Sequence, residues 1–130
     1  MDLSEYIGIP YRFGGSSRDG ADCWGLVRLI YRERYGKELP AFDHDGLTEE
    51  ECGLMVDHGK PLVNATRVGG IPIIGDLVVL KIHGAPCHIG IVIGGPGERN
   101  LLHTLKGHDS AIDRYDGPKW ACRLEGFYRV

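Results

Sequence analysis

The pattern of hydrophobic positions in the first third of the chain is that of an amphipathic helix. From Cys23 onward, apolar side chains recur at intervals of three and four residues, which places them on one face of an α-helix. Asp22 precedes this run and is a suitable N-cap, because its carboxylate accepts hydrogen bonds from first-turn amides. Gly36 follows the run as the predicted C-cap. The pattern therefore predicts a helix from Cys23 to about Tyr35.

Other helical signals in this half of the chain are shorter. Residues 2–8 are compatible with a short helix, and a second full helix is predicted to open at Thr48 and end near Gly59. Thr48 and Glu51 form the T-x-x-E capping box that marks its start. The segments between these helices are predicted to be an extended arm over 11–15, a loop over 16–21 and an irregular stretch over 59–75.

The second half of the chain shows the two-residue alternation of β-strands. Its strands are rich in β-branched residues and are separated by glycine and proline turns. Helices followed by hairpin-linked strands are typical of an α+β domain, with N-terminal helices packed on an antiparallel sheet. A length of 130 residues predicts one domain over 1–130. The predicted strands cover 76–82, 88–94, 100–105, 110–115 and 123–130.

Composition narrows the class of protein. Hydrophobic residues make up 42% and charged residues 25%, as in soluble globular proteins, and the net charge of −3 with no basic run argues against nucleic acid. No apolar run reaches the roughly 20 residues that span a bilayer. The acidic start lacks a signal peptide, so we expect synthesis in the cytoplasm with reduced thiols. We expect no metal or other cofactor, because no C-x-x-C pair occurs among Cys23, Cys52, Cys87 and Cys122.

Cys23 is the candidate nucleophile of the chain. A cysteine in the first turn of a helix lies among backbone N–H groups and at the positive end of the helix dipole, and both stabilise a thiolate. The alternative is a small buried hydrophobic residue, which is what most free cysteines are. The choice depends on whether the fold supplies a base for Cys23.

Two histidines are candidates for that base and its orienting partner. Strand alternation places His88 and Gly90 on one face, and we expect the helix of Cys23 to pack on this glycine-rich face. A two-residue loop after this strand sets His103 opposite His88, and a four-residue loop sets it opposite Gly90. Both registers leave the histidines on one face, whereas an odd loop separates them. The alternatives are a core histidine for His88 and a surface residue for His103.

A thiol, an imidazole and a third polar group form the nucleophile–base–orienter arrangement of acyl transfer. The residues that suggest this arrangement also resemble, in order and spacing, the NlpC/P60 family of cysteine peptidases. The blocks that carry the resemblance are Tyr11-Arg12-Phe13-Gly14-Gly15, Asp22-Cys23-Trp24-Gly25-Leu26-Val27, Gly75-Asp76-Leu77-Val78, His88-Ile89-Gly90-Ile91 and His103.

The resemblance implies a papain-like α+β fold and hydrolysis of an amide bond in peptidoglycan stem peptides, typically the γ-D-glutamyl to diamino-acid bond. It implies Cys23 as the nucleophile, His88 as the base and His103 as the third polar residue. Tyr11 matches a tyrosine near the oxyanion or a substrate subsite, and Asp22 matches a residue that contacts the free amine of the stem peptide. It implies no metal cofactor.

One position departs from the family pattern. Trp24 follows the nucleophile where the family usually has serine, and it resembles forms from bacteriophage tails and gene-transfer particles. Trp24 is expected to narrow the substrate groove; the alternative is an ordinary core aromatic residue. Without a signal peptide or wall-binding repeat, we expect a phage- or prophage-type protein that acts at the bacterial cell wall, with phage-tail proteins as partners.

Three other functions use the same residues. The chain is alternatively a structural tail-assembly or wall-binding module whose site does not turn over. Acyl transfer to an acceptor other than water needs the same catalytic groups. A metal site built from Cys23, His88 and His103 is chemically feasible as well.

Overall fold

The computed structural model describes residues 2–41, 64–82, 84–95 and 97–130. Two short 3-10 helices, η1 and η2, accompany one α-helix and eight strands in this part of the chain. In chain order the elements are η1 (Ser4–Tyr6), β1 (Ser16–Ser17), β2 (Gly20–Ala21), α1 (Cys23–Arg34), β3 (Thr66–Arg67), β4 (Leu77–Ile82), β5 (Ala85–Ile93), β6 (Asn100–His103), β7 (Ala111–Arg114), η2 (Ala121–Arg123) and β8 (Leu124–Arg129).

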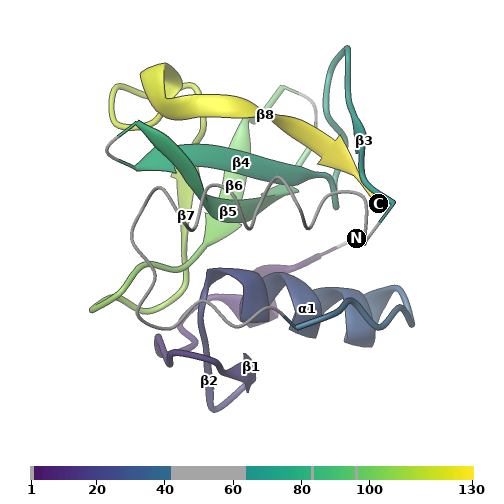
Figure 1. The fold of residues 1–130 in the computed structure, drawn as a ribbon, viewed down its shortest axis with the longest axis vertical. Helices are drawn as coiled ribbons and strands as arrows, with labels where there is room; N and C mark the ends of the chain where they lie inside the picture. The colour runs from purple at the N-terminus through teal and green to yellow at the C-terminus, as the bar shows by residue number, and fades with distance from the viewer. Residues whose placement is uncertain (1, 42–63, 83, 96) are drawn as a thin grey trace.

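A six-stranded antiparallel sheet forms most of the fold. Its strand order is β3-β8-β4-β5-β6-β7, so β4 to β7 form a meander and β8 pairs with β4 from the other side. Figure 1 shows this sheet on one side of α1, and the β1–β2 hairpin near the beginning of the helix. One helix packed on an antiparallel sheet confirms the predicted α+β class.

Each face of the sheet carries its own apolar layer. Leu77, Val79 and Ile91 point toward α1 and pack with the buried face of the helix. Val78 and Val92, one residue further along their strands, point to the opposite face. That face is covered by the segment between β7 and β8, which supplies Tyr115 and Trp120. Residues 77–80 of β4 and 88–93 of β5 are therefore buried on both faces, which explains the nearly continuous apolar sequence of these segments.

Helix α1 begins and ends where the sequence predicts. The Asp22 side chain caps it, with Oδ1 accepting from the Gly25 amide at 2.7 Å. At the other end Gly36 has a φ of +61°, a left-handed conformation that glycine adopts at little cost. The buried side of the helix consists of Gly25, Leu26, Val27, Leu29, Ile30 and Tyr31.

The arm before α1 is held against the first turn of the helix. The Gly14 amide donates to Asp22 Oδ2 at 2.9 Å, and Ser16 Oγ donates to the Gly25 carbonyl at 2.9 Å. Gly25 lies so close to this arm that a Cβ at its position would be 1.7 Å from the Gly15 carbonyl oxygen. Glycine is therefore required at position 25 for the arm and the helix to meet.

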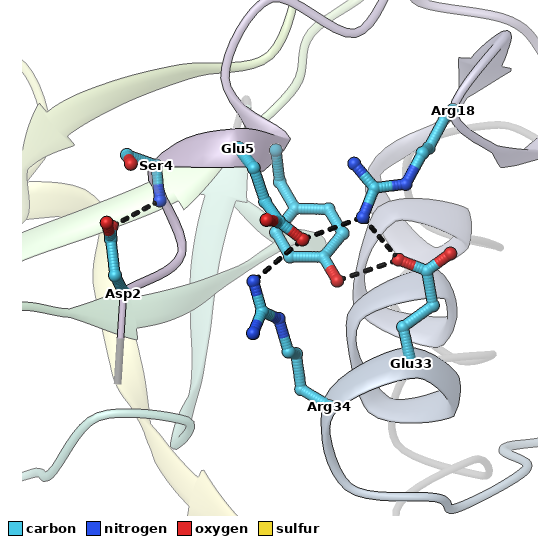
Figure 2. Close-up of polar contacts among 7 residues, drawn as sticks. Asp2, Ser4, Glu5, Arg18, Glu33 and Arg34 are labelled. Atoms are coloured by element: carbon cyan, nitrogen blue, oxygen red, sulfur yellow. Dashed lines mark hydrogen bonds and ion pairs between the residues drawn. The ribbon is translucent and has the colours of Figure 1, made fainter.

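A group of charged side chains fastens the N-terminal segment to the outer side of α1 (Figure 2). Arg18 lies between Glu5 and Glu33, at 2.7 Å from a carboxylate oxygen of each. Arg34 also contacts Glu5 at 2.7 Å, and the buried Tyr6 donates its hydroxyl to Glu33 at 2.8 Å. Exposed ion pairs contribute only about 0–1 kcal/mol each, so these contacts orient the segment more than they stabilise it.

Several predicted elements differ from those observed. The loop predicted over 16–21 contains the β1–β2 hairpin, and the helix predicted over 2–8 is reduced to Ser4–Tyr6. Strand β5 begins at Ala85 instead of 88, because Gly84, with a φ of +84°, allows a tighter turn than predicted. The irregular stretch over 59–75 contains β3. The helix predicted from Thr48 to Gly59 lies outside the described residues.

The contact between the arm and α1 predicts an unusual effect of alanine in a helix. Gly25→Ala should lower the free energy of unfolding by about 1–3 kcal/mol, because the new Cβ collides with the Gly15 carbonyl oxygen. Helix propensity alone predicts that this substitution raises the free energy of unfolding by about 1 kcal/mol. Gly69→Ala is the control, since a Cβ there meets nothing within 4 Å. Urea denaturation of both variants measures the effect, and a stabilised Gly25→Ala would contradict it.

Candidate active site

Cys23 is the first residue of α1, as predicted. Its side chain is partly exposed and packs against the apolar layer beneath the helix, so it is not enclosed in hydrocarbon. The thiol is free. First-turn amides and the helix dipole therefore act on a cysteine that is only partly buried, and this is the environment of a reactive cysteine.

His88 and His103 form a buried hydrogen-bonded pair. The β5–β6 register pairs Ile91 with Leu102 and Val92 with Leu101, and its continuation sets His103 opposite Gly90. This is the register predicted for a four-residue loop. His88 Nε2 and His103 Nδ1 are 2.7 Å apart, and both residues are only 3% exposed. The prediction that the two histidines share one face is confirmed.

The prediction that α1 covers this glycine-rich face is wrong. The helix packs on the opposite face, against Ile89 and Ile91, because these large side chains offer its apolar stripe more area to bury. The space above Gly90 is filled from β6 instead. A Cβ at Gly90 would lie 2.7 Å from Leu101 Cδ1 and 3.1 Å from His103 Cβ. The absence of a side chain at Gly90 thus makes room for His103, and α1 does not pack there.

Two residues that the sequence analysis did not single out complete the cluster. Asp113 Oδ2 lies 2.8 Å from His103 Nε2 and accepts a hydrogen bond from Trp120 Nε1 at 3.1 Å. Trp120 also stacks on the His88 ring, with centroids 5.7 Å apart and planes inclined by 22°. A single acidic residue within a predicted strand was a usable signal for Asp113; nothing marked Trp120.

Burial sets the charge state of the cluster. Desolvation, with His103 and Lys119 nearby, lowers the pKa of His88 to about 3. Desolvation also lowers the pKa of His103, although the hydrogen bond and charge of Asp113 act in the opposite direction. Burial by itself raises the pKa of Asp113, but the hydrogen bonds from His103 and Trp120 bring it below its usual range. At neutral pH the cluster therefore consists of two neutral imidazoles and one carboxylate.

The other three predicted site residues surround the start of α1. Tyr11 forms an isolated bridge with Ala21, which brings it beside the N-cap. Asp22 is 3% exposed, and its two carboxylate oxygens accept from Gly25 and Gly14. Its observed role is thus to cap the helix, and its contact with a substrate amine stays a prediction. Trp24 is partly buried and donates its indole N–H to the Pro40 carbonyl at 2.7 Å.

The part of the chain that the structure describes contains neither a cluster of metal-ligating side chains nor a membrane-spanning helix. Over 2–41, 64–82, 84–95 and 97–130, no group of three or more His, Cys, Asp and Glu side chains is arranged to hold a metal ion. Within the same ranges, no helix combines the length and the apolar character needed to cross a membrane.

A helix-start cysteine beside a sheet that carries a histidine pair defines a papain-like α+β domain. Residues 8–129 match the model of the NlpC/P60 family, and the chain belongs to this family. It is 28% identical over 127 residues to the murein DD-endopeptidase MepS/murein LD-carboxypeptidase of Escherichia coli K12, covering 98% of this chain and 58% of the relative.

One further relative and one solved structure are similar to the chain. The chain is 45% identical over 91 residues to the "Probable endopeptidase NlpC" of the same organism, covering 68% of this chain and 50% of that protein. It therefore spans about half the length of these curated relatives. The crystal structure of the NlpC/P60 domain of the peptidoglycan hydrolase SagA shares the fold, with a TM-score of 0.61 at 21% identity and coverage of 98% and 91%.

The buried neutral histidines predict a loss of stability in mild acid. The pKa of His88 falls from 6.5 in the unfolded chain to about 3, so the unfolded state alone binds this proton between those values. Stability must then decrease as the pH falls below 6.5, with a slope approaching about 1.4 kcal/mol per pH unit for this group. The pKa values of Asp113 and Asp116 are lowered, so their losses begin below about pH 4.

Urea denaturation at pH values from 7 to 5 measures this slope. His88→Gln should flatten it, whereas His108→Gln, which alters an exposed loop histidine, should not. Equal stability of the wild-type protein at pH 7 and pH 5 would contradict the buried neutral state.

Proposed function

We propose that the protein is a cysteine endopeptidase that cleaves an amide bond in peptidoglycan stem peptides. The observation that carries the proposal is the buried His88–His103 pair, with 2.7 Å between Nε2 and Nδ1, in a fold that sets Cys23 at the start of α1. Family membership and similarity to a murein endopeptidase support the same substrate class.

In this mechanism Cys23 is the nucleophile and His88 the base. The thiol transfers its proton to His88, and the thiolate attacks the carbonyl carbon of the substrate amide. The backbone N–H of Cys23, with Tyr11 as a second donor, stabilises the oxyanion. The C–N bond breaks as His88 returns the proton to the leaving amine, which leaves a thioester on Cys23. His88 then activates a water molecule, whose attack releases the carboxylic acid and restores the thiol.

The hydrogen bonds of His88 identify the nitrogen that exchanges this proton. Nε2 is engaged by His103, so the thiol proton goes to Nδ1. Because α1 packs on the other face of the sheet, Cys23 and His88 are proposed to meet at the margin of the α1–β5 contact, not across the glycine-rich face. A thiolate at Cys23 would supply the negative charge that offsets the cost of protonating the buried His88.

The proposed scissile bond is the γ-D-glutamyl to diamino-acid bond, and water is the proposed acyl acceptor. The relative MepS is described as a DD-endopeptidase and LD-carboxypeptidase, so the assay has to separate these bonds. Mass spectrometry of muropeptides after digestion does so, because each bond gives fragments of different mass. Added amines reveal acyl transfer, since they would appear in the product.

We further propose that the protein is of phage or prophage type and reaches the cell wall as part of a tail. Trp24, which replaces the usual serine after the nucleophile, is the residue that supports this origin. Its indole N–H donates to the Pro40 carbonyl at 2.7 Å, which restrains the ring. A substrate groove narrowed by this ring is part of the proposal. Purified tails of a particle that encodes the chain should contain it, as detected by peptide mass spectrometry.

Three substitutions test the catalytic roles. Cys23→Ala and His88→Ala should abolish muropeptide cleavage, because each removes a group that breaks or forms bonds. His103→Ala should retain reduced activity, because His103 only orients the base. His108→Ala, which changes an exposed histidine, is the control and should leave turnover intact. Full activity of Cys23→Ala would exclude the mechanism.

Thiol labelling distinguishes an enzyme from an inert structural module. At pH 6, iodoacetamide should modify Cys23 faster than Cys122, an exposed free thiol that serves as an internal reference. Peptide mapping by mass spectrometry measures both rates in one sample. His88→Gln should slow labelling of Cys23 and leave Cys122 unchanged. Equal slow labelling of both thiols, without muropeptide cleavage, would favour a tail-assembly or wall-binding module.

A further inference from the structure

Asp113 is the outermost member of a chain of hydrogen bonds that begins at the proposed base. His88 Nε2 lies 2.7 Å from His103 Nδ1, and His103 Nε2 lies 2.8 Å from Asp113 Oδ2. The two histidines are 3% exposed, whereas the Asp113 side chain is 39% exposed. A polar path thus runs from the interior to the protein surface at the edge strand β7.

The proton positions along this path follow from the chemistry of its end. An ionised carboxylate only accepts hydrogen bonds, so His103 must carry its proton on Nε2. A neutral imidazole has one proton, which leaves Nδ1 of His103 as an acceptor. His88 must then donate from Nε2, and its own lone pair is left on Nδ1. That is the nitrogen that the proposed mechanism requires for the thiol proton.

Trp120 keeps Asp113 in the accepting state. Its indole N–H is a donor only, and it binds the same oxygen, Oδ2, at 3.1 Å. Two donors on one oxygen restrain the carboxylate and favour its ionised form. The indole also stacks on His88 and meets the edge of the His103 ring at a centroid distance of 5.3 Å. The rings therefore have little freedom to turn over.

We infer that Asp113 is a positioning residue, which fixes the tautomer of His103 and, through it, the tautomer of the base His88. The inference rests on the proposed function for its catalytic consequence, but the tautomers themselves can be observed without any turnover. No other acidic side chain contacts either histidine among the described residues, so a second source of this constraint is absent there.

Nitrogen-15 NMR of the histidine rings in the wild-type protein at neutral pH is the direct test. Long-range proton–nitrogen correlations should show a protonated Nε2 and an unprotonated Nδ1 in both His88 and His103. A ring of either histidine that carries its proton on Nδ1 while Nε2 is unprotonated would overturn the inference. This result does not depend on activity, so it is separate from any failure of the proposed peptidase function.

Two substitutions at Asp113 separate its acceptor role from its charge. Asp113→Leu removes the acceptor; both rings should then populate mixed tautomers, and kcat should fall about 10- to 100-fold while KM changes little. Asp113→Asn keeps an acceptor oxygen and should preserve the tautomers and part of the activity. Asp116→Leu is the matched control, because that carboxylate binds Arg99 and Arg114 instead of a histidine.

The outcomes of the Asp113 variants are decisive in either direction. Unchanged tautomers and unchanged kcat in Asp113→Leu would overturn the inference, as would an equal loss in Asp116→Leu. If Asp113→Leu fails to fold, the wild-type spectrum and the Asp113→Asn variant still decide.

Discussion

A hydrogen bond between two neutral imidazoles inside the sheet is the interaction on which the site depends. A buried polar group without a partner costs several kcal/mol, so His88 and His103 must face each other once both strands are packed. Gly90 makes this possible, because any larger side chain would occupy the space of Leu101 and His103. Gly90 of β5 thus leaves the space that His103 of β6 occupies. The contact between Gly90 and His103 sets the register of the two strands.

The two apolar layers have different roles: one positions Cys23 and the other buries the two histidines. The layer under α1 anchors the helix and so holds Cys23 at its margin, where the residue is only partly buried. The layer on the other face, centred on Trp120, dehydrates the histidines and keeps them uncharged. The proposed nucleophile and the proposed base therefore belong to different layers, and the proposed chemistry requires them to meet where α1 adjoins the sheet.

Local and periodic features of the chain were predictable, and long-range ones were not. The cap at Asp22 and the helix behind it depend on neighbours in sequence, and both are confirmed. His88 and His103 fall on one face because strand alternation has a period of two, which any even loop preserves. The helix was predicted on the wrong face of the sheet. The face that carries Ile89 and Ile91 offers α1 more apolar area to bury than the face of Gly90 does. Asp113 was missed because the β6–β7 register depends on a loop over 104–110 that periodicity does not constrain.

The position of β8 has a consequence for how the chain reaches its native state. Strand β8 lies between β3 and β4, and the buried Asp76 at the start of β4 binds Arg129 at the end of β8 through two contacts of 2.8 Å. Until residues 124–129 leave the ribosome, one edge of β4 is unpaired and the Asp76 carboxylate has no arginine. In the nascent chain this edge of β4 therefore exposes unpaired backbone groups that can pair with other chains. The sheet is completed only after β8 has been synthesised.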